Sequence, residues 1–389
     1  MTVLLRRLAP LLSIVLLLGV QVAIGATPAS AVSYGTATKI SAGGYQACAI
    51  TPSHHLKCWG DNDYGQLGIG SDLSDQLKPV TVPNLDNVMH VSVGDYNTCA
   101  ILKGGKLKCW GYNDYGAVGD GTTHERHLPT QVNGLTSGVK SVSVGEYHAC
   151  ALLTSGKVKC WGDNSDGAVG VGTSGDVYKS PKVVDNIKQA TQVSAGYYYS
   201  CATVNGHAKC WGYNGDGELG DKSVQDKYSP VQVFGLTSGV KQVIAGYYTT
   251  CALLKGGKLK CWGYNYYGEV GTGVSGNEYH RPVQVVGMTS GVSAVDTDYY
   301  FTCAAQNGHA KCWGDDQYNQ LGDGATDPRD VPRQVSGLTS GVTDVDISFY
   351  TGCALLKSGA EKCWGWNGEG EVGIDSGNDQ IPTPKRVHL

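Results

Sequence analysis

The chain has 389 residues, a formal net charge of −4 and 14 cysteines. The negative charge argues against nucleic-acid binding, which rewards a basic surface. Beyond the first 31 residues no stretch is apolar enough to cross a bilayer.

The N-terminal residues 1–31 have the pattern of a secretory signal. Arg6 and Arg7 precede an apolar run at residues 11–22, and Ala29-Ser30-Ala31 is a small-residue cleavage site. Cleavage removes two arginines and no acid, so the net charge changes from −4 to −6. An uncleaved N-terminal anchor is the alternative. Export places the cysteines in an oxidising compartment, where we expect disulfides.

One sequence motif, here called a phrase, recurs seven times. It consists of a cysteine, eight or nine further residues of which the last is lysine, and then Cys-Trp-Gly. The third copy runs from Cys150 to Gly162. Successive tryptophans of this phrase are 50 or 51 residues apart, and they are Trp59, Trp110, Trp161, Trp211, Trp262, Trp313 and Trp364. A fixed period of this length indicates a repeat architecture.

Each repeat contains four short strand-like runs separated by Gly, Asn, Asp and Ser. In the second repeat these runs are residues 88–93, 98–102, 107–110 and 129–132. No segment shows sustained helical periodicity. The pattern predicts an all-β fold over residues 32–389, a seven-bladed β-propeller of four-stranded blades.

The two cysteines of each repeat are predicted to face each other across a hairpin. Where their spacing is 9, the turn centres are Asn205-Gly206 and Asn307-Gly308, which suit a two-residue turn. Where it is 10, a three-residue loop needs a left-handed third residue, and glycine stands there in four of five repeats. The predicted disulfides, one per blade, are Cys48–Cys58, Cys99–Cys109, Cys150–Cys160, Cys201–Cys210, Cys251–Cys261, Cys303–Cys312 and Cys353–Cys363. The alternative, seven metal sites, lacks a recurring histidine.

The fourth run of each repeat is predicted to open with proline and to form the outer edge of its blade. These prolines are Pro79, Pro129, Pro181, Pro230, Pro282, Pro332 and Pro384. Whether the ring closes by exchanging a strand between its ends is left open at this point.

The pattern G-x-Y-x-x-C-A-L, then G-x-x-K-C-W-G-x-N-x-x-G-x-x-G and P-x-x-V, resembles the repeat of the regulator of chromosome condensation family over residues 36–389. The resemblance implies a seven-bladed propeller. With its export signal and paired cysteines the chain looks more like secreted bacterial members. Of these, β-lactamase inhibitory protein II is distantly similar in carrying aromatics on inter-strand loops, which it uses to bind a protein.

A tyrosine lies three residues before the first cysteine of every repeat, in the loop between the first and second strands. Because tyrosine offers a large contact area with a polar tip, we expect a binding face there. The alternative is that the recurring tyrosines are packing residues under the next blade. The candidate binding residues are Tyr147, Tyr197, Tyr198, Tyr199, Tyr247, Tyr248, Tyr299, Tyr300, Phe301, Phe349 and Tyr350.

Enzyme motifs are missing: there is no G-x-S-x-G, and the residues 124–127 lack the spacing of a zinc helix. The acidic loop at residues 61–65 only loosely resembles a calcium loop, which leaves weak calcium binding open. We therefore expect a secreted, monomeric binding protein with no catalytic residues, no resident metal and no cofactor. It should recognise an extracellular protein, or alternatively a glycan, without inserting into a membrane after signal cleavage. Guanine-nucleotide exchange, implied by the nuclear family member, ranks last among the binding functions.

Overall fold

Every regular element in residues 35–389, the part of the chain that this computed structural model describes, is a β-strand. The expected secretory signal at residues 1–31 lies outside the described residues. None of the described segments is a helix able to span a bilayer.

The strands group into seven sheets of four. Blades one to three contain β1 (Lys39–Gly43), β2 (Gln46–Ile50), β3 (Leu56–Gly60), β4 (Gln76–Thr81), β5 (Val88–Val93), β6 (Asn97–Leu102), β7 (Lys106–Gly111), β8 (Arg126–Gln131), β9 (Val139–Val144), β10 (His148–Leu153), β11 (Val158–Asp163) and β12 (Val177–Val183). Blades four and five contain β13 (Ala190–Ala195), β14 (Tyr199–Val204), β15 (His207–Gly212), β16 (Lys227–Gln232), β17 (Val240–Ala245), β18 (Thr249–Leu254), β19 (Leu259–Gly263) and β20 (Tyr279–Gln284). Blades six and seven contain β21 (Val292–Asp298), β22 (Phe301–Gln306), β23 (His309–Gly314), β24 (Arg329–Gln334), β25 (Val342–Ile347), β26 (Thr351–Leu356), β27 (Glu361–Trp366) and β28 (Gln380–Arg386).

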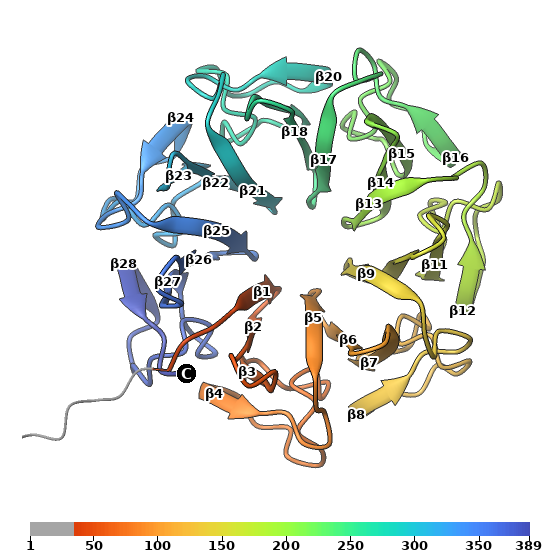
Figure 1. The fold of residues 1–389 in the computed structure, drawn as a ribbon. Helices are drawn as coiled ribbons and strands as arrows, with labels where there is room; N and C mark the ends of the chain where they lie inside the picture. The colour runs from red at the N-terminus through yellow and green to blue at the C-terminus, as the bar shows by residue number, and fades with distance from the viewer. Residues whose placement is uncertain (1–34) are drawn as a thin grey trace, which may run out of the picture. The chain divides into compact units, whose positions relative to one another are not determined.

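The predicted seven-bladed propeller is confirmed. Within each sheet the strands are antiparallel and follow chain order, and the first strand lies nearest the central axis while the fourth lies at the rim (Figure 1). The ring closes without strand exchange, because β28 pairs with β27 of its own repeat. Hydrogen bonds join the two ends of the ring instead: Gly35 N donates to the Leu389 carbonyl at 3.2 Å, and Ala37 N to the Gly359 carbonyl at 2.8 Å.

All seven predicted disulfides form, each between directly opposed residues of one hairpin. The turn chemistry follows the prediction, since Asn205 and Gly206 both have positive φ, at 52° and 79°. In the first repeat, which lacks the expected glycine, His54 takes the left-handed position with φ 61°. The disulfides therefore close short hairpins and leave the loops on the other face of the ring unconstrained.

The fourth strands are the blade edges, as predicted, but they do not open with proline. Pro129 is the fourth residue of β8, and the ladder to β7 shifts register around it: Cys109 faces Thr130, whereas Gly111 faces Arg126. The same shift occurs in the other six blades. Each proline thus lies in a bulge, where its missing N–H removes no ladder bond.

The seven repeated tryptophans pack between blades and are fully buried. Each indole N–H donates to a main-chain carbonyl of the preceding blade at 2.8 Å, as Trp161 does to Ala117 and Trp211 to Ala168. Trp59 donates to Glu371 and so links the first blade to the last. The most regular motif of the sequence is therefore a scaffold for the ring.

Candidate functional site

Aromatic rings from every blade form one connected network on a single face of the propeller. Rings in the loops between first and second strands contact rings in the loops between third and fourth strands, as Tyr64 contacts Tyr96 with centroids 5.6 Å apart. We call this surface the Tyr-rich face. Its members are Tyr45, Tyr64, Tyr96, Tyr112, Tyr115, Tyr147, Tyr197, Tyr198, Tyr247, Tyr248, Tyr264, Tyr266, Tyr267, Tyr299, Tyr300, Tyr318, Phe349, Tyr350 and Trp366.

The outer part of this face is accessible. Tyr266 is 63% exposed and Tyr115 is 38% exposed, although both rings touch other tyrosines of the network. Burial raises the pKa of Tyr264 and Tyr248 to about 12. Their hydroxyls therefore stay neutral at physiological pH and can both donate and accept hydrogen bonds.

The inner part of the face is asymmetric. The residue before the recurring tyrosine is aromatic only in blades four to seven, where Tyr197 and Tyr247 stack with centroids 3.7 Å apart and Tyr247 meets Tyr299 at 5.0 Å. In blades two and three the same position holds Asp95 and Glu146. At this position one side of the axis is aromatic and the other acidic, while Asp298 adds an acid on the aromatic side.

The structure brings nine of the eleven candidate binding residues together in this network. The expected exposure of the other two, Tyr199 and Phe301, is wrong, because both are fully buried. They are the first residues of β14 and β22, and they lie opposite Gly212 and Gly314 in the hairpins. The Tyr199 hydroxyl donates to the Thr249 carbonyl of the next blade, so this ring ties two blades together.

A ladder of side chains connects the innermost strands around the axis. In four blades a serine accepts the N–H of the next blade's inner strand; Ser143 Oγ, for example, accepts from Ala195 N at 3.0 Å. In blades six and seven aspartates replace serine: Asp296 accepts from Ile347 N at 2.9 Å and Asp346 from Ala42 N at 2.7 Å. These two carboxylates therefore hold the ring together.

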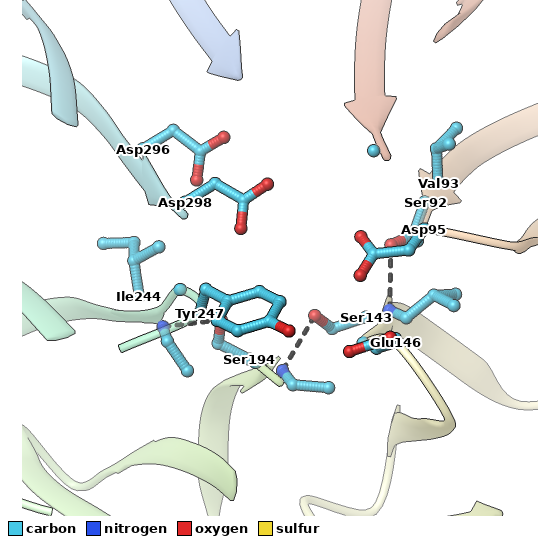
Figure 2. A pocket seen from close by; sticks show the side chains of 18 of the residues that line it. Ser92, Val93, Asp95, Ser143, Glu146, Ser194, Ile244, Tyr247, Asp296 and Asp298 are labelled. Atoms are coloured by element: carbon cyan, nitrogen blue, oxygen red, sulfur yellow. Dashed lines mark hydrogen bonds between the residues drawn. The ribbon is translucent and has the colours of Figure 1, made fainter. Parts of the chain in front are cut away.

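A cavity of about 170 Å³ lies on the axis between these strands and the aromatic layer. Figure 2 shows Asp95, Asp298 and Glu146 turned toward one space that the Tyr247 ring borders. Burial raises the pKa of Glu146 to about 7 and that of Asp298 to about 8, and the Asp298 and Glu146 charges add to burial in raising the pKa of Asp95. No basic side chain of the described residues lines the cavity, and burial therefore favours the protonated forms of these carboxyls near neutral pH.

The loops after each Trp-Gly owe their shape to a buried amide or carboxylate, as their sequence predicts. Asn113 Oδ1 accepts from Val118 N at 2.9 Å, and the other blades repeat this bond. Asp61, Asp63 and Asp75 come close enough to share a cation, but Asp61 already accepts from Gln66 and Asp63 N. Asp75 likewise accepts from Asn62 N at 3.1 Å, so Asp61 and Asp75 cap the loop.

Sequence reasoning missed the axial carboxylates Asp296, Asp298 and Asp346. For Asp296 and Asp346 the available signal was the aspartate that replaces the serine of the first four repeats at one position of the first strand, and for Asp298 it was the aspartate at a position that is glycine in the first five repeats. These side chains face the axis only when the blades are assembled into a ring. The alternation of polar and apolar residues within a single strand therefore did not show that they share one cavity.

The fold and the site define a disulfide-bonded propeller with one face rich in aromatic rings. The family model described as "Regulator of chromosome condensation (RCC1) repeat" matches residues 56–101, 105–152, 155–203, 205–253 and 307–355. A second model of the same repeat matches residues 37–66, 89–117, 139–168 and 240–269. The chain belongs to the regulator of chromosome condensation repeat family.

Curated relatives match over less than half of this chain. The E3 ubiquitin-protein ligase HERC2 of Homo sapiens is 32% identical over 166 residues, which are 41% of this chain and 3% of HERC2. The Ultraviolet-B receptor UVR8 of Arabidopsis thaliana is 31% identical over 167 residues, 42% of this chain and 38% of the receptor. The match thus spans well under two thirds of either relative.

Two solved structures share the fold. Prp20p from Saccharomyces cerevisiae has a TM-score of 0.75 and 20% identity, with 85% of each chain covered. Human WBSCR16 has a TM-score of 0.77 and 22% identity, with 86% of this chain and 95% of that chain covered.

Proposed function

We propose that this protein is a secreted binding propeller that recognises one protein partner through its Tyr-rich face. The observation that carries the proposal is the continuous network of aromatic rings, part buried and part exposed, on that face. Tyrosines fixed by their neighbours lose little conformational entropy on binding and supply both apolar area and hydrogen bonds. They are suited to a broad contact surface.

The asymmetry of the face favours a protein over a glycan. Seven equivalent shallow sites, one per blade, would suit a repeated sugar. Instead, Tyr197, Tyr247 and Phe349 crowd one side of the axis while Asp95 and Glu146 occupy the other. A single surface of this kind matches one partner in one orientation. The yeast propeller is itself described as bound to Kap60 and as binding Gsp1p and histones, which supports a protein-binding role for this fold.

Disulfides support the export part of the proposal. All fourteen cysteines are paired, and none of the described residues is a free cysteine. Such pairing persists in oxidising compartments and is rare in the cytosol. Secretion is tested by probing culture medium, cell surface and lysate for the protein. Accumulation in the lysate with free thiols would contradict export.

The binding role is tested by affinity capture from the producer's surface and medium. The informative variant is Tyr247→Ala/Tyr266→Ala, which removes one inner and one outer ring of the Tyr-rich face. The matched control is Tyr228→Ala/Phe234→Ala, because these rings are 41% and 45% exposed but lie outside the face. We expect the first variant to lose a protein that wild type and control both retain. Equal capture by all three would refute the site, and loss of a carbohydrate ligand instead would favour the glycan alternative.

A further inference from the structure

The axial cavity contains three carboxylates that make no hydrogen bond between inner strands. Asp296 and Asp346 accept main-chain N–H groups across blade boundaries, and so their charges have structural partners. Asp95, Glu146 and Asp298 make no such bond between the inner strands, although Asp95 accepts the main-chain N–H of Gly44 just beyond β1. All three line the same cavity on the side of the Tyr-rich face. Their role needs a separate explanation.

Glu146 points to a ligand most directly. Its side chain is only 6% exposed, and its Oε2 is buried without a hydrogen-bond partner among the described residues. A buried charged oxygen without a partner is costly, typically by more than a net hydrogen bond contributes. Figure 2 shows this carboxylate directed into the cavity. A positively charged group seated there would satisfy it.

The walls supply no such group. Within residues 35–389, no lysine, arginine or histidine lines this cavity. The opposite end of the axis differs, since a second cavity there includes Lys39 and His90 beside Asp344, and the Lys39 charge counteracts the burial that raises the pKa of Asp344. Only the end below the Tyr-rich face combines uncompensated acids with aromatic rings.

The geometry also selects the kind of cation. Three carboxylate ligand atoms within 4.8 Å of one another would suit a metal ion, and among the described residues the axial acids form no such group. The space of about 170 Å³ is larger than a bare ion needs, because cavities of roughly 150 Å³ admit a benzene-sized molecule. Tyr197 and Tyr247 also line the wall, and the face of an aromatic ring attracts organic cations.

We propose that the axial cavity binds one alkylammonium group, seated on the Glu146 carboxylate against the Tyr197 and Tyr247 rings, with Asp95 and Asp298 adding negative charge from the other walls. Burial is the main cause of the raised pKa values of Glu146 and Asp298, and a cation seated beside them would counteract it by favouring their charged forms. Binding should release protons near pH 7, since a seated cation lowers those pKa values. The titratable groups that face the cavity are Asp95, Glu146, Tyr197, Tyr247, Asp296, Asp298 and Asp346.

The inference extends the proposed function without depending on it, because the test uses a small probe and no partner. The full chain is titrated with n-butylammonium at pH 8 by calorimetry, with n-butanol as the uncharged control. We expect binding of the ammonium alone, weakened at least tenfold by Glu146→Gln and by Asp298→Asn. Asp114→Asn, which removes an exposed acid on the same face, should leave the affinity unchanged.

Two further arms identify the source and the class of cation. A blocked Gly-Gly-Lys-Gly-Gly peptide that binds as tightly as n-butylammonium points to a lysine of a partner, whereas binding of the free amine alone points to a small metabolite. Repeating the titration in two buffers of different ionisation enthalpy detects the expected proton release. The proposal is overturned if neither amine binds or if Glu146→Gln binds the amine as tightly as wild type does. It is also overturned if calcium displaces the amine and binds with the higher affinity of the two.

Discussion

Replacing Trp161 with phenylalanine should cost more stability than the same change at Trp211. Both indoles are fully buried and donate at 2.8 Å to an alanine carbonyl of the preceding blade, Ala117 and Ala168 respectively. The Ala168 carbonyl also accepts from the Ser200 hydroxyl at 3.0 Å. Opposite Trp161 the corresponding residue is Ala149, which has no hydroxyl.

The loss of indole volume is common to both variants, and it should cost about 1–3 kcal/mol. Trp161→Phe additionally leaves a buried carbonyl without a partner, which costs about 1–3 kcal/mol more. Trp211→Phe incurs little of this second cost, because the Ser200 hydroxyl still donates to the Ala168 carbonyl. The expected difference in unfolding free energy between the variants is therefore on the order of 1–2 kcal/mol, or roughly a 5- to 30-fold change in the unfolding equilibrium.

Urea unfolding of the oxidised proteins measures this difference through the transition midpoint and slope. Trp366→Phe is the control, because Trp366 is half-buried on the Tyr-rich face and lies outside the inter-blade positions. We expect it to change stability by less than about 0.5 kcal/mol. Equal losses at Trp161 and Trp211, or a larger loss at Trp211, would refute the role assigned to the inter-blade bond.

Three further changes test other parts of the account. Replacing Cys201 and Cys210 with alanine should lower the unfolding free energy by about 2–3 kcal/mol in non-reducing urea; a change below about 0.5 kcal/mol would contradict the stabilising role of the hairpin disulfide. Burial raises the pKa of Glu269 to about 8, above its ordinary value. Ionising this buried carboxyl therefore costs stability: the cost is absent below about pH 4.5, where the group is protonated in both states, and it grows as the pH rises to 8. Glu269→Gln should therefore reduce the loss of stability between pH 5 and pH 8, by about 1–3 kcal/mol, whereas Asp379→Asn, which replaces an exposed acid, should not; equal pH profiles for Glu269→Gln and wild type would show the shift to be unimportant. Tyr199→Phe removes the hydroxyl that donates to the Thr249 carbonyl, and should lower the unfolding free energy by about 1 kcal/mol without changing partner capture. If the variant is as stable as wild type but no longer captures the partner, Tyr199 is a binding residue.

The fold could be predicted from the sequence because the same local signals recur seven times. The spacing of the cysteines and the Asn-Gly turns at residues 205–206 and 307–308 independently require the same hairpin register. The position of proline was harder to place, since Pro129 can open an edge strand or occupy a bulge, and only the pairing with β7 distinguishes the two.

The site was only partly predictable. The recurring tyrosines predicted the face on which the aromatic rings gather, but a one-residue uncertainty in where β14 and β22 begin made the buried Tyr199 and Phe301 look like loop residues. The axial acids were not predicted for a different reason. Asp298 and Glu146 belong to different repeats, and only closure of the ring brings them to one cavity.

Hydrogen–deuterium exchange of the protein, alone and with its captured partner, tests whether the partner binds the Tyr-rich face. The account predicts slowed exchange in the loops that carry the Tyr-rich face, above all residues 196–199, 246–248 and 264–268. The hairpin turns on the opposite face, such as residues 103–105 and 255–257, should exchange as in the free protein. Slowed exchange confined to those turns, with the tyrosine loops unchanged, would contradict the assignment of the binding face.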